Sequence, residues 1–144
     1  MICQADERNI AQAARLACLL WPDNGLEEME RELAALLKKG EAAVFLFFTE
    51  NRPVGFAQCQ LRHDYVEGTD SSPVGYLEGI FVEEGYRGRG IARSLLGACE
   101  TWVRERGCRE FASDCELDNA ESLAFHLRCG FAEANRVICF TKTL

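Results

Sequence analysis

The sequence predicts an α+β (mixed α/β) fold whose central sheet is mostly antiparallel and contains one β–α–β unit. Two observations lead to this class. First, three apolar runs of strand length follow one another, and a short turn joins the first two as in an antiparallel hairpin. Second, a long amphipathic helical pattern then separates two strand-like runs, and a helix between two strands of one sheet is the usual crossover of a parallel pair.

Two helices are expected near the N-terminus. The first covers residues 7–20 and ends at Trp21-Pro22, because proline disfavours helical backbone in the residue before it. The second covers residues 26–40, where apolar residues recur at helical spacing and Gly40 stands at the C-terminal cap position. The expected order is one strand, these two helices, three strands, and then helix, strand, helix and strand.

The remaining elements are read from the same periodicities. The three strands cover residues 42–48, 54–62 and 74–82, with a turn at residues 50–53. After them we expect a helix at 90–107, a short strand at 108–115, a helix at 118–130, and one or two strands in residues 131–144.

Length and composition predict one domain spanning residues 1–144. The cytoplasm is its expected location. No apolar run approaches the roughly 20 residues that cross a bilayer, and the N-terminus lacks the pattern of a signal peptide. No membrane partner is therefore expected. The eight cysteines form no CxxC pair and the two histidines have no metal-ligand spacing, so we expect reduced thiols, most of them filling core space, and no metal site.

The net charge of −7 argues against nucleic acid as a partner and suits a cationic one. Charge is segregated along the chain. Residues 61–84 hold six acids and one arginine, whereas residues 86–109 hold six arginines and two glutamates. Two neighbouring segments of opposite sign are consistent with two ligands of opposite charge, and equally with two solvated faces.

A glycine-rich loop, Arg87-Gly88-Arg89-Gly90-Ile91-Ala92, stands where a strand turns into a helix. A helix N-terminus presents unpaired N–H groups and partial positive charge, and glycines let the backbone approach a ligand closely. The loop therefore fits a pyrophosphate, although a glycine turn with solvated arginines is the alternative. It is neither the nucleotide P-loop nor the dinucleotide fingerprint.

This loop, with the apolar strand before it and the helix after it, resembles the acetyl-CoA signature [RQ]-x-x-G-x-[GA] of the GCN5-related N-acetyltransferase (GNAT) superfamily. Asn119 through Gly130-Phe131 resembles the last helix of that fold, and the element order is similar along nearly the whole chain. Separate blocks of sequence are most similar to the aminoglycoside 6′-N-acetyltransferases. These blocks are Trp21-Pro22 and residues 62–66, 70–74, 77–82, 108–110 and 112–114.

The resemblance implies a homodimer that transfers acetyl from acetyl-CoA to the 6′-amine of aminoglycosides by direct attack in a ternary complex. It also implies that backbone N–H groups of the strand bind the pantetheine, that one of them polarises the acetyl carbonyl, and that the loop holds the pyrophosphate. His126 stands where many members carry a tyrosine that protonates the departing thiolate. The cofactor-binding residues it implies are Ile80, Phe81, Val82, Arg87, Gly88, Arg89, Gly90, Ile91, Ala92, Arg93, Asn119 and His126.

Glu78 and Asp114 are the candidate catalytic and substrate-binding carboxylates. Glu78 lies within an apolar run, where desolvation raises the pKa of a carboxyl group towards that of a useful base. Asp114 ends the strand that this fold places beside the Glu78 strand. Which of the two takes the proton from the amine is left open. A strand carboxylate that faces solvent or pairs with an arginine is the alternative for Glu78, and a capping role is the alternative for Asp114.

The other candidate substrate-binding residues are Trp21, Tyr65, Asn119 and Asn135. The two aromatic rings offer flat faces for sugar rings and ammonium groups, although either ring is also compatible with plain packing. Three alternative functions remain open: an acetyltransferase of a polyamine or another small amine, including a protein N-terminus; a non-catalytic acetyl-CoA-binding module; and a purely structural α+β domain.

Overall fold

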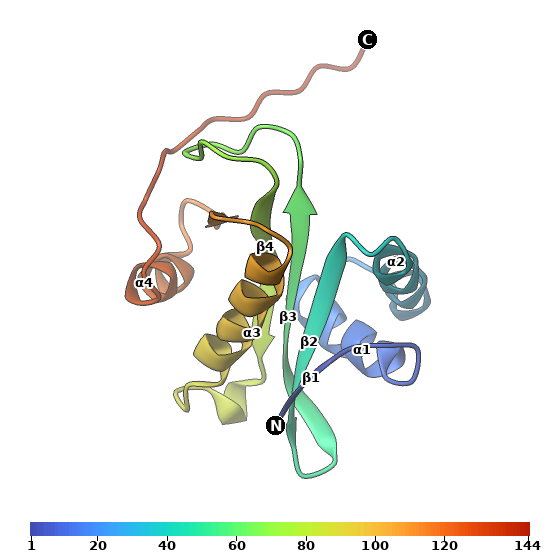
Figure 1. Ribbon diagram of the computed structural model, residues 1–144. Helices are drawn as coiled ribbons and strands as arrows, with labels where there is room; N and C mark the ends of the chain where they lie inside the picture. The colour runs from blue at the N-terminus through green and yellow to red at the C-terminus, as the bar shows by residue number, and fades with distance from the viewer.

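The computed structural model describes all 144 residues, and Figure 1 shows a sheet with helices on both faces. The described elements are β1 (Ile2–Gln4), α1 (Ile10–Leu20), α2 (Leu26–Lys38), β2 (Ala42–Thr49), β3 (Arg52–Arg62), β4 (Val74–Val82), the 3-10 turn η1 (Glu84–Tyr86), α3 (Ile91–Glu105), β5 (Phe111–Ser113) and α4 (Ala120–Arg128).

The five strands lie in the order β1-β2-β3-β4-β5. Every neighbouring pair is antiparallel except β4 and β5, which are parallel and are joined through α3. The prediction of a mostly antiparallel sheet with one β–α–β unit is therefore confirmed. Helices α1 and α2 lie on one side of the sheet and α3 on the other (Figure 1).

The sheet is buried on both faces, which is why β2 reads as a continuous apolar run rather than an alternating one. Ala43 and Phe45 pack on the α3 side, and Val44 and Leu46 pack on the α1–α2 side. Of the eight cysteines, Cys59, Cys99 and Cys108 are buried in the core on the α3 side, and all eight thiols are unpaired. None of the helices is both long and apolar enough to cross a membrane.

Strand β5 covers only a small part of its neighbour. It has three residues and pairs with Gly75, Tyr76 and Leu77 alone, at the start of β4. The rest of β4, Glu78–Val82, pairs with β3 on one side and has no strand on the other. We call this unpaired side of Glu78–Val82 the open edge of β4.

Several expected boundaries are corrected by the structure. The predicted strand at 108–115 is reduced to β5, the first helix begins at Ile10 rather than residue 7, and β3 starts inside the expected turn, at Arg52. Prediction from sequence is least reliable at such element ends.

The expectation of one or two strands in residues 131–144 is wrong for the chain by itself. These residues contain no helix or strand, and the segment after α4 extends away from the body of the molecule (Figure 1). Strand propensity needs a hydrogen-bonding partner to become structure, and this segment reaches no free strand edge of its own sheet.

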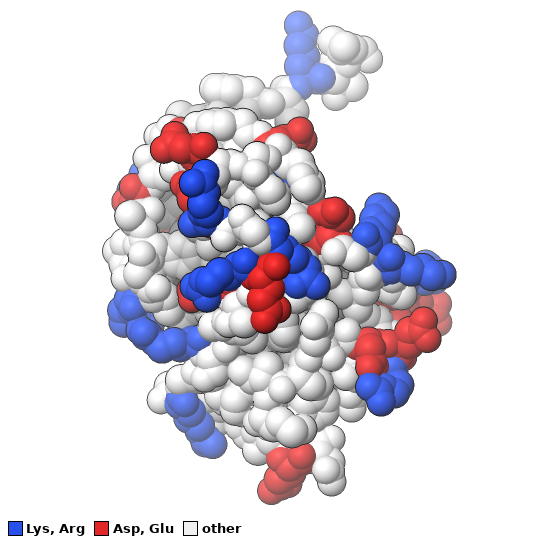
Figure 2. All heavy atoms as spheres, viewed as in Figure 1, with Lys and Arg blue, Asp and Glu red and all other residues white.

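The charge segregation along the sequence does not become two large patches on the surface viewed in Figure 2. Acidic and basic side chains lie interspersed there among uncharged atoms. The charges that matter for function are therefore local ones, at particular elements.

The packing of β4 against α3 gives a test of the fold. A methyl group at Gly75 would lie 2.7 Å from Val103 Cγ1 and 2.9 Å from the Phe111 ring. We expect Gly75→Ala to lower the free energy of unfolding by about 1–3 kcal/mol, the usual cost of overpacking. In Gly97→Ala, on α3, the added methyl meets nothing within 4 Å, and this control should gain about 0.5–1 kcal/mol. Urea unfolding measures both, and a Gly75→Ala variant as stable as the wild type contradicts this packing.

Candidate functional site

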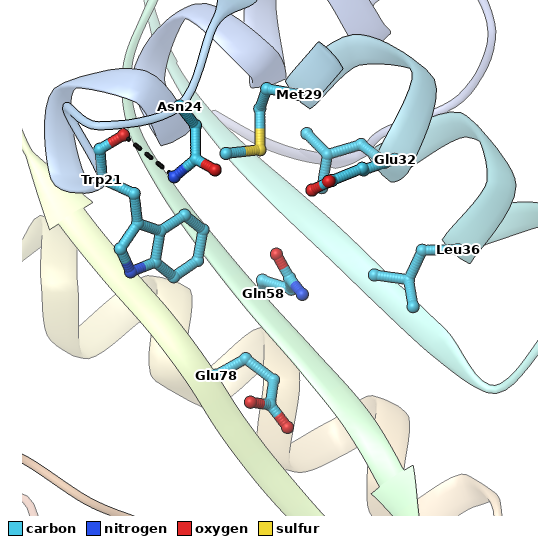
Figure 3. Close-up of a pocket in the computed structure, with 8 residues that line it drawn as sticks. Trp21, Asn24, Met29, Glu32, Leu36, Gln58 and Glu78 are labelled. Atoms are coloured by element: carbon cyan, nitrogen blue, oxygen red, sulfur yellow. Dashed lines mark hydrogen bonds between the residues drawn. The ribbon is translucent and has the colours of Figure 1, made fainter. Parts of the chain in front are cut away.

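A cavity of about 350 Å³ opens between helices α1–α2 and strands β3–β4. Figure 3 shows Met29, Glu32 and Leu36 reaching in from α2, with Gln58 and Glu78 below them on the strands. Its only charged side chains are the carboxylates Glu32 and Glu78, so it is suited to a cation. The residues that line it are Trp21, Asn24, Met29, Glu32, Leu33, Leu36, Gln58 and Glu78.

Glu78 faces this cavity at an irregularity in β4. Gln58 pairs with Gly79 and the next residue, Cys59, pairs with Leu77, so Glu78 is an extra residue in β4. Such a bulge changes which face the following side chains reach, and bulges often occur beside active sites. Here it lets two consecutive residues, Glu78 and Gly79, both face the α1–α2 side.

Gly79 brings the strand up against the Trp21 ring. A methyl group at Gly79 would lie 2.6 Å from Trp21 Cζ2 and 2.9 Å from Leu20 Cδ2, so only glycine fits. The indole also packs edge-on against Phe56, with ring centroids 5.9 Å apart. Trp21 is thus fixed by packing and also forms one wall of the cavity, as expected for a substrate platform.

The Glu78 carboxylate is largely buried, with 19% of its side chain exposed, and it is paired with Arg62. Arg62 donates from Nε at 3.1 Å and from Nη2 at 2.9 Å to Oε1, and from Nη2 at 3.0 Å to Oε2. Burial is the largest effect on this group, and it holds the pKa of Glu78 above its ordinary value although the Arg62 guanidinium acts in the opposite direction.

Asp114 lies directly after β5, on the far side of Tyr76 from Arg62. The Tyr76 hydroxyl donates a hydrogen bond to Asp114 Oδ2, and the Arg62 guanidinium stacks on the Tyr76 ring with its Cζ 3.4 Å from the centroid. Burial and the Asp114 carboxylate raise the pKa of the Tyr76 hydroxyl, so it stays protonated as a donor. The two carboxylates are linked through the Tyr76 ring and Arg62, and the charge of Asp114 also raises the pKa of Glu78.

The loop between η1 and α3 has the backbone that an anion cradle needs. Gly88 has φ 75° and Gly90, the residue before α3, has φ 77°, both in the left-handed region that favours glycine. The first helical hydrogen bond of α3 runs from Ser94 N to Gly90 O, and no side chain caps the helix. The N–H groups of Ile91, Ala92 and Arg93 therefore remain free for a ligand.

The arginines of this loop are held in place by backbone oxygens. Arg87 Nε donates to Val82 O at 2.8 Å, Arg89 Nη2 to Gly85 O at 3.1 Å, and Arg93 Nη2 to Arg128 O at 2.8 Å. Their remaining N–H groups add positive charge beside the helix N-terminus.

The predicted pantetheine-binding residues, Ile80, Phe81 and Val82, all lie on the open edge of β4. Antiparallel pairing with β3 uses the backbone groups of alternate residues. The other N–H and C=O groups face the side on which β5 is missing. An extended ligand can pair there as an added strand does, between the anion cradle at one end of the edge and Glu78 at the other.

Asn119 and His126 are positioned by α4. Asn119 is its N-cap, with Oδ1 accepting from Ser122 N at 3.0 Å, as its place in the sequence predicts. His126 Nδ1 donates to Ser122 O at 2.7 Å, and its Nε2 lies 2.8 Å from Ser113 Oγ. Both ring nitrogens of His126 are therefore engaged, and the ring ties α4 to β5.

Tyr65 and Asn135 lie at the loop that joins β3 to β4. The Tyr65 side chain is among the most exposed aromatic groups, at 77%, and Asn135 Nδ2 donates to Glu67 Oε1 at 3.0 Å, which ties the C-terminal segment to that loop. Neither residue lines the cavity.

Four residues of the site were not singled out from the sequence: Glu32, Gln58, Arg62 and Tyr76. Glu32 reads as one more acid on an amphipathic helix, and no pattern distinguishes it. Tyr76 and Arg62 carry a weak signal, because strands 54–62 and 74–82 were expected to pair and a paired register sets Arg62 near the start of the second strand. The bulge, which sequence does not reveal, completes the arrangement.

Two glutamates test the electrostatics of the site. We expect Glu78 to titrate above the ordinary glutamate value of 4.5 because burial outweighs its arginine. Glu83 should titrate below its ordinary value, because Arg52 and Arg15 both bind it. Carboxyl ¹³C NMR across the acid range measures both, and a Glu78 pKa at or below that of Glu83 rejects this description.

Comparisons with known proteins agree with this geometry. Residues 10–131 match the model of the acetyltransferase (GNAT) family. An aminoglycoside N(6′)-acetyltransferase type 1 from Stenotrophomonas maltophilia is 45% identical, over 99% of this chain and 93% of the relative. A protein of the same name from Acinetobacter baumannii is 38% identical, over 99% and 98%.

Solved structures give the same result. The structure of AAC(6′)-Iy in complex with the bisubstrate analog CoA-S-monomethyl-acetylneamine superposes with a TM-score of 0.95 at 37% identity, over 100% of this chain and 98% of that one. AAC(6′)-IG from Acinetobacter haemolyticus, in its apo form, gives 0.93 at 34% identity, over 100% and 99%. The fold that carries this site thus has full-length counterparts in known enzymes, and this chain belongs to the GNAT family of acetyltransferases.

Proposed function

We propose that this protein is an aminoglycoside 6′-N-acetyltransferase that uses acetyl-CoA and confers resistance to these antibiotics. The observation that carries the proposal is the pairing of two sites of opposite charge along β4. An acidic cavity at Glu78 adjoins one end of the open edge, and the anion cradle of α3 adjoins the other. This arrangement fits a polycationic acceptor and a pyrophosphate-bearing donor, and the relatives that match the whole chain carry this activity in their names.

Acetyl-CoA supplies the acetyl group as a thioester. The N–H groups of Ile91, Ala92 and Arg93, with Arg87 and Arg89, are suited to its pyrophosphate. The free backbone groups of the open edge are suited to its pantetheine arm. A free N–H there, close to Glu78, would also stabilise negative charge developing on the acetyl oxygen.

Glu78 is the group best suited to take a proton from the acceptor. The 6′-amine arrives as an ammonium ion and must lose a proton before its nitrogen attacks the thioester carbonyl. The raised pKa of Glu78 brings this base closer to the operating pH. A C–N bond then forms and the C–S bond breaks. The attacking nitrogen then loses a second proton, and the CoA thiolate takes up one proton and leaves as the thiol.

Asp114, held by Tyr76, adds a second negative charge beside the acceptor. Glu32 adds a third, across the cavity from Glu78 (Figure 3). Three carboxylates on separate elements suit an acceptor whose amines are spread over several rings. Trp21 supplies a rigid wall for a sugar ring, and the exposed Tyr65 ring on the β3–β4 loop offers a second aromatic face outside the cavity lining.

A polyamine acetyltransferase is the second candidate. The same carboxylates suit a linear polycation, but the flat wall of Trp21 favours rings. A module that only senses acetyl-CoA needs no buried carboxylate with a raised pKa, so Glu78 argues against it.

Steady-state kinetics with two amines test the function. We expect turnover of kanamycin A and little turnover of spermidine. At least one of Glu78→Gln and Asp114→Asn should lose roughly 10²-fold or more in kcat, the scale of a lost general base. Circular dichroism checks that each variant is folded. If kanamycin A is inert while acetyl-CoA still binds, the aminoglycoside assignment falls and the polyamine or sensor function takes its place.

We also propose that the protein is a cytoplasmic homodimer and that its C-terminal segment takes part in the contact. The segment after α4 is extended and exposes Val137, Ile138 and Phe140, at 70%, 82% and 88%. Three large apolar side chains on one exposed stretch are unusual unless another surface covers them. A second copy of the chain is the partner that the family resemblance implies.

Light scattering after size exclusion tests the dimer. We expect twice the chain mass of 16.1 kDa for the wild type. Ile138→Asp should weaken dimerisation about tenfold or more, because it removes buried apolar surface and adds a charge. Thr141→Asp adds the same charge at a polar position and serves as the control. A monomeric wild type, or equal effects of the two changes, contradicts the proposal.

A further inference from the structure

Arg62 is the one cation bonded to the carboxylates of the acceptor cavity. It makes three hydrogen bonds to both oxygens of Glu78 and lies flat on the Tyr76 ring, which in turn bonds Asp114. No basic side chain lines the cavity itself, and Glu32, on its opposite wall, has no salt-bridge partner. From beside the cavity, the Arg62 guanidinium therefore holds both oxygens of the carboxylate that a cationic acceptor would meet.

We propose that Arg62 is a resident cation of the acceptor site, bound to Glu78 in the free enzyme and displaced by the ammonium group of the incoming acceptor. The proposal rests on the function proposed above. It makes Arg62 a positioning residue that competes with the substrate, rather than a catalytic residue.

Two features give Arg62 a route out of the site. It is the last residue of β3, so its backbone adjoins the long β3–β4 loop, and 38% of its side chain is exposed while it is paired with Glu78. The guanidinium can move to water without disturbing the sheet. Its departure leaves a cation-shaped space bounded by Glu78 and the Tyr76 ring, and an aromatic face also attracts an ammonium group.

A second ion-paired glutamate, Glu83 directly after β4, gives a comparison with a carboxylate that is held permanently. Glu83 is bound by Arg15 at 3.0 Å and by Arg52 at 2.7 Å, and Arg15 also donates to Pro53 O at 2.9 Å. These bonds outweigh burial and hold the pKa of Glu83 below its ordinary value. Glu78 has one arginine, and there burial prevails over the ion pair. Because a single arginine holds Glu78, the departure of that one side chain frees the carboxylate for another cation.

A resident cation has a physical use in this site. A carboxylate buried without a partner is costly, so the pair keeps the free enzyme stable until substrate arrives. A guanidinium holds its proton throughout the accessible pH range, so it cannot be acetylated in place of the substrate. When Arg62 leaves, Glu78 loses the charge that favours its ionised form and becomes a stronger base for the ammonium group beside it.

The test compares Arg62→Gln with the wild type. Calorimetry should show kanamycin A binding about fivefold more tightly to Arg62→Gln, because the substrate no longer has to displace an arginine from Glu78. The acidic limb of the pH profile of kcat/KM should move to higher pH, since Arg62 lowers the pKa of Glu78 while burial and Asp114 raise it. Arg62→Lys keeps a displaceable charge, so its affinity for kanamycin A and its acidic limb should lie between those of Arg62→Gln and the wild type.

Arg52→Gln is the matched control. It is the same substitution on the same strand and removes one arginine from Glu83, and it should leave both readings unchanged. If Arg62 instead fixes Glu78 for catalysis, Arg62→Gln will bind kanamycin A less tightly and lose kcat. That result overturns the proposal, and so does an unchanged affinity.

Failure of the proposed function is distinguished from failure of the Arg62 proposal by a separate observation. Wild-type enzyme that neither binds nor acetylates kanamycin A rejects the aminoglycoside assignment. The Arg62 proposal is then decided by NMR of its Nε–H group. Methylammonium at millimolar concentration should release this group from Glu78 in the wild type, and a signal that does not change rejects the exchange.

Discussion

Strand β4 carries one residue more than its partner between Gln58 and Cys59, and the site depends on that extra residue. Without the bulge, strict alternation would turn Gly79 towards α3 and away from Trp21. With the bulge, Glu78 enters the cavity under α2 and Gly79 lies against Trp21. The strand also outlasts β5, so the residues after Glu78 keep an open edge that leads to the anion cradle of α3. One local irregularity thus links acceptor and donor sites on a single strand.

The carboxylates of the site have few partners of opposite charge. Glu83, a few residues from Glu78, shows that this fold can hold a carboxylate firmly with two arginines. At Glu78 it provides only Arg62, and burial keeps the carboxylate basic. Stability is given up at this point in exchange for a base that can take a proton and a cavity that can take a cation, which is common at functional sites.

Most of the architecture was predictable because its physical signals are local. The apolar run of β2 and the glycine-rich turn before α3 each mark an element by composition and period. The anion cradle was predictable for the same reason, since Gly88 and Gly90 stand next to a helix start. Glu78 was found because one acid in an apolar strand is rare.

What the sequence did not reveal depends on tertiary context. The bulge is a relation between two strands, so neither strand alone shows it, and the roles of Arg62, Tyr76 and Glu32 depend likewise on contacts between separate elements. Strands in residues 131–144 were expected from apolar and β-branched residues such as Val137 and Ile138, but a strand forms only where an edge receives it. Within one chain the segment extends away from the sheet and pairs with none of its edges, which is why the sequence pattern and the fold disagree there.

The account as a whole is tested most directly by a crystal structure with CoA and kanamycin A bound together. It predicts the pyrophosphate on the N–H groups of Ile91, Ala92 and Arg93, the pantetheine along the open edge of β4, and the 6′-nitrogen within hydrogen-bonding distance of Glu78. A kanamycin A molecule bound outside the cavity between α2 and β4, with its 6′-nitrogen remote from both Glu78 and Asp114, would contradict it.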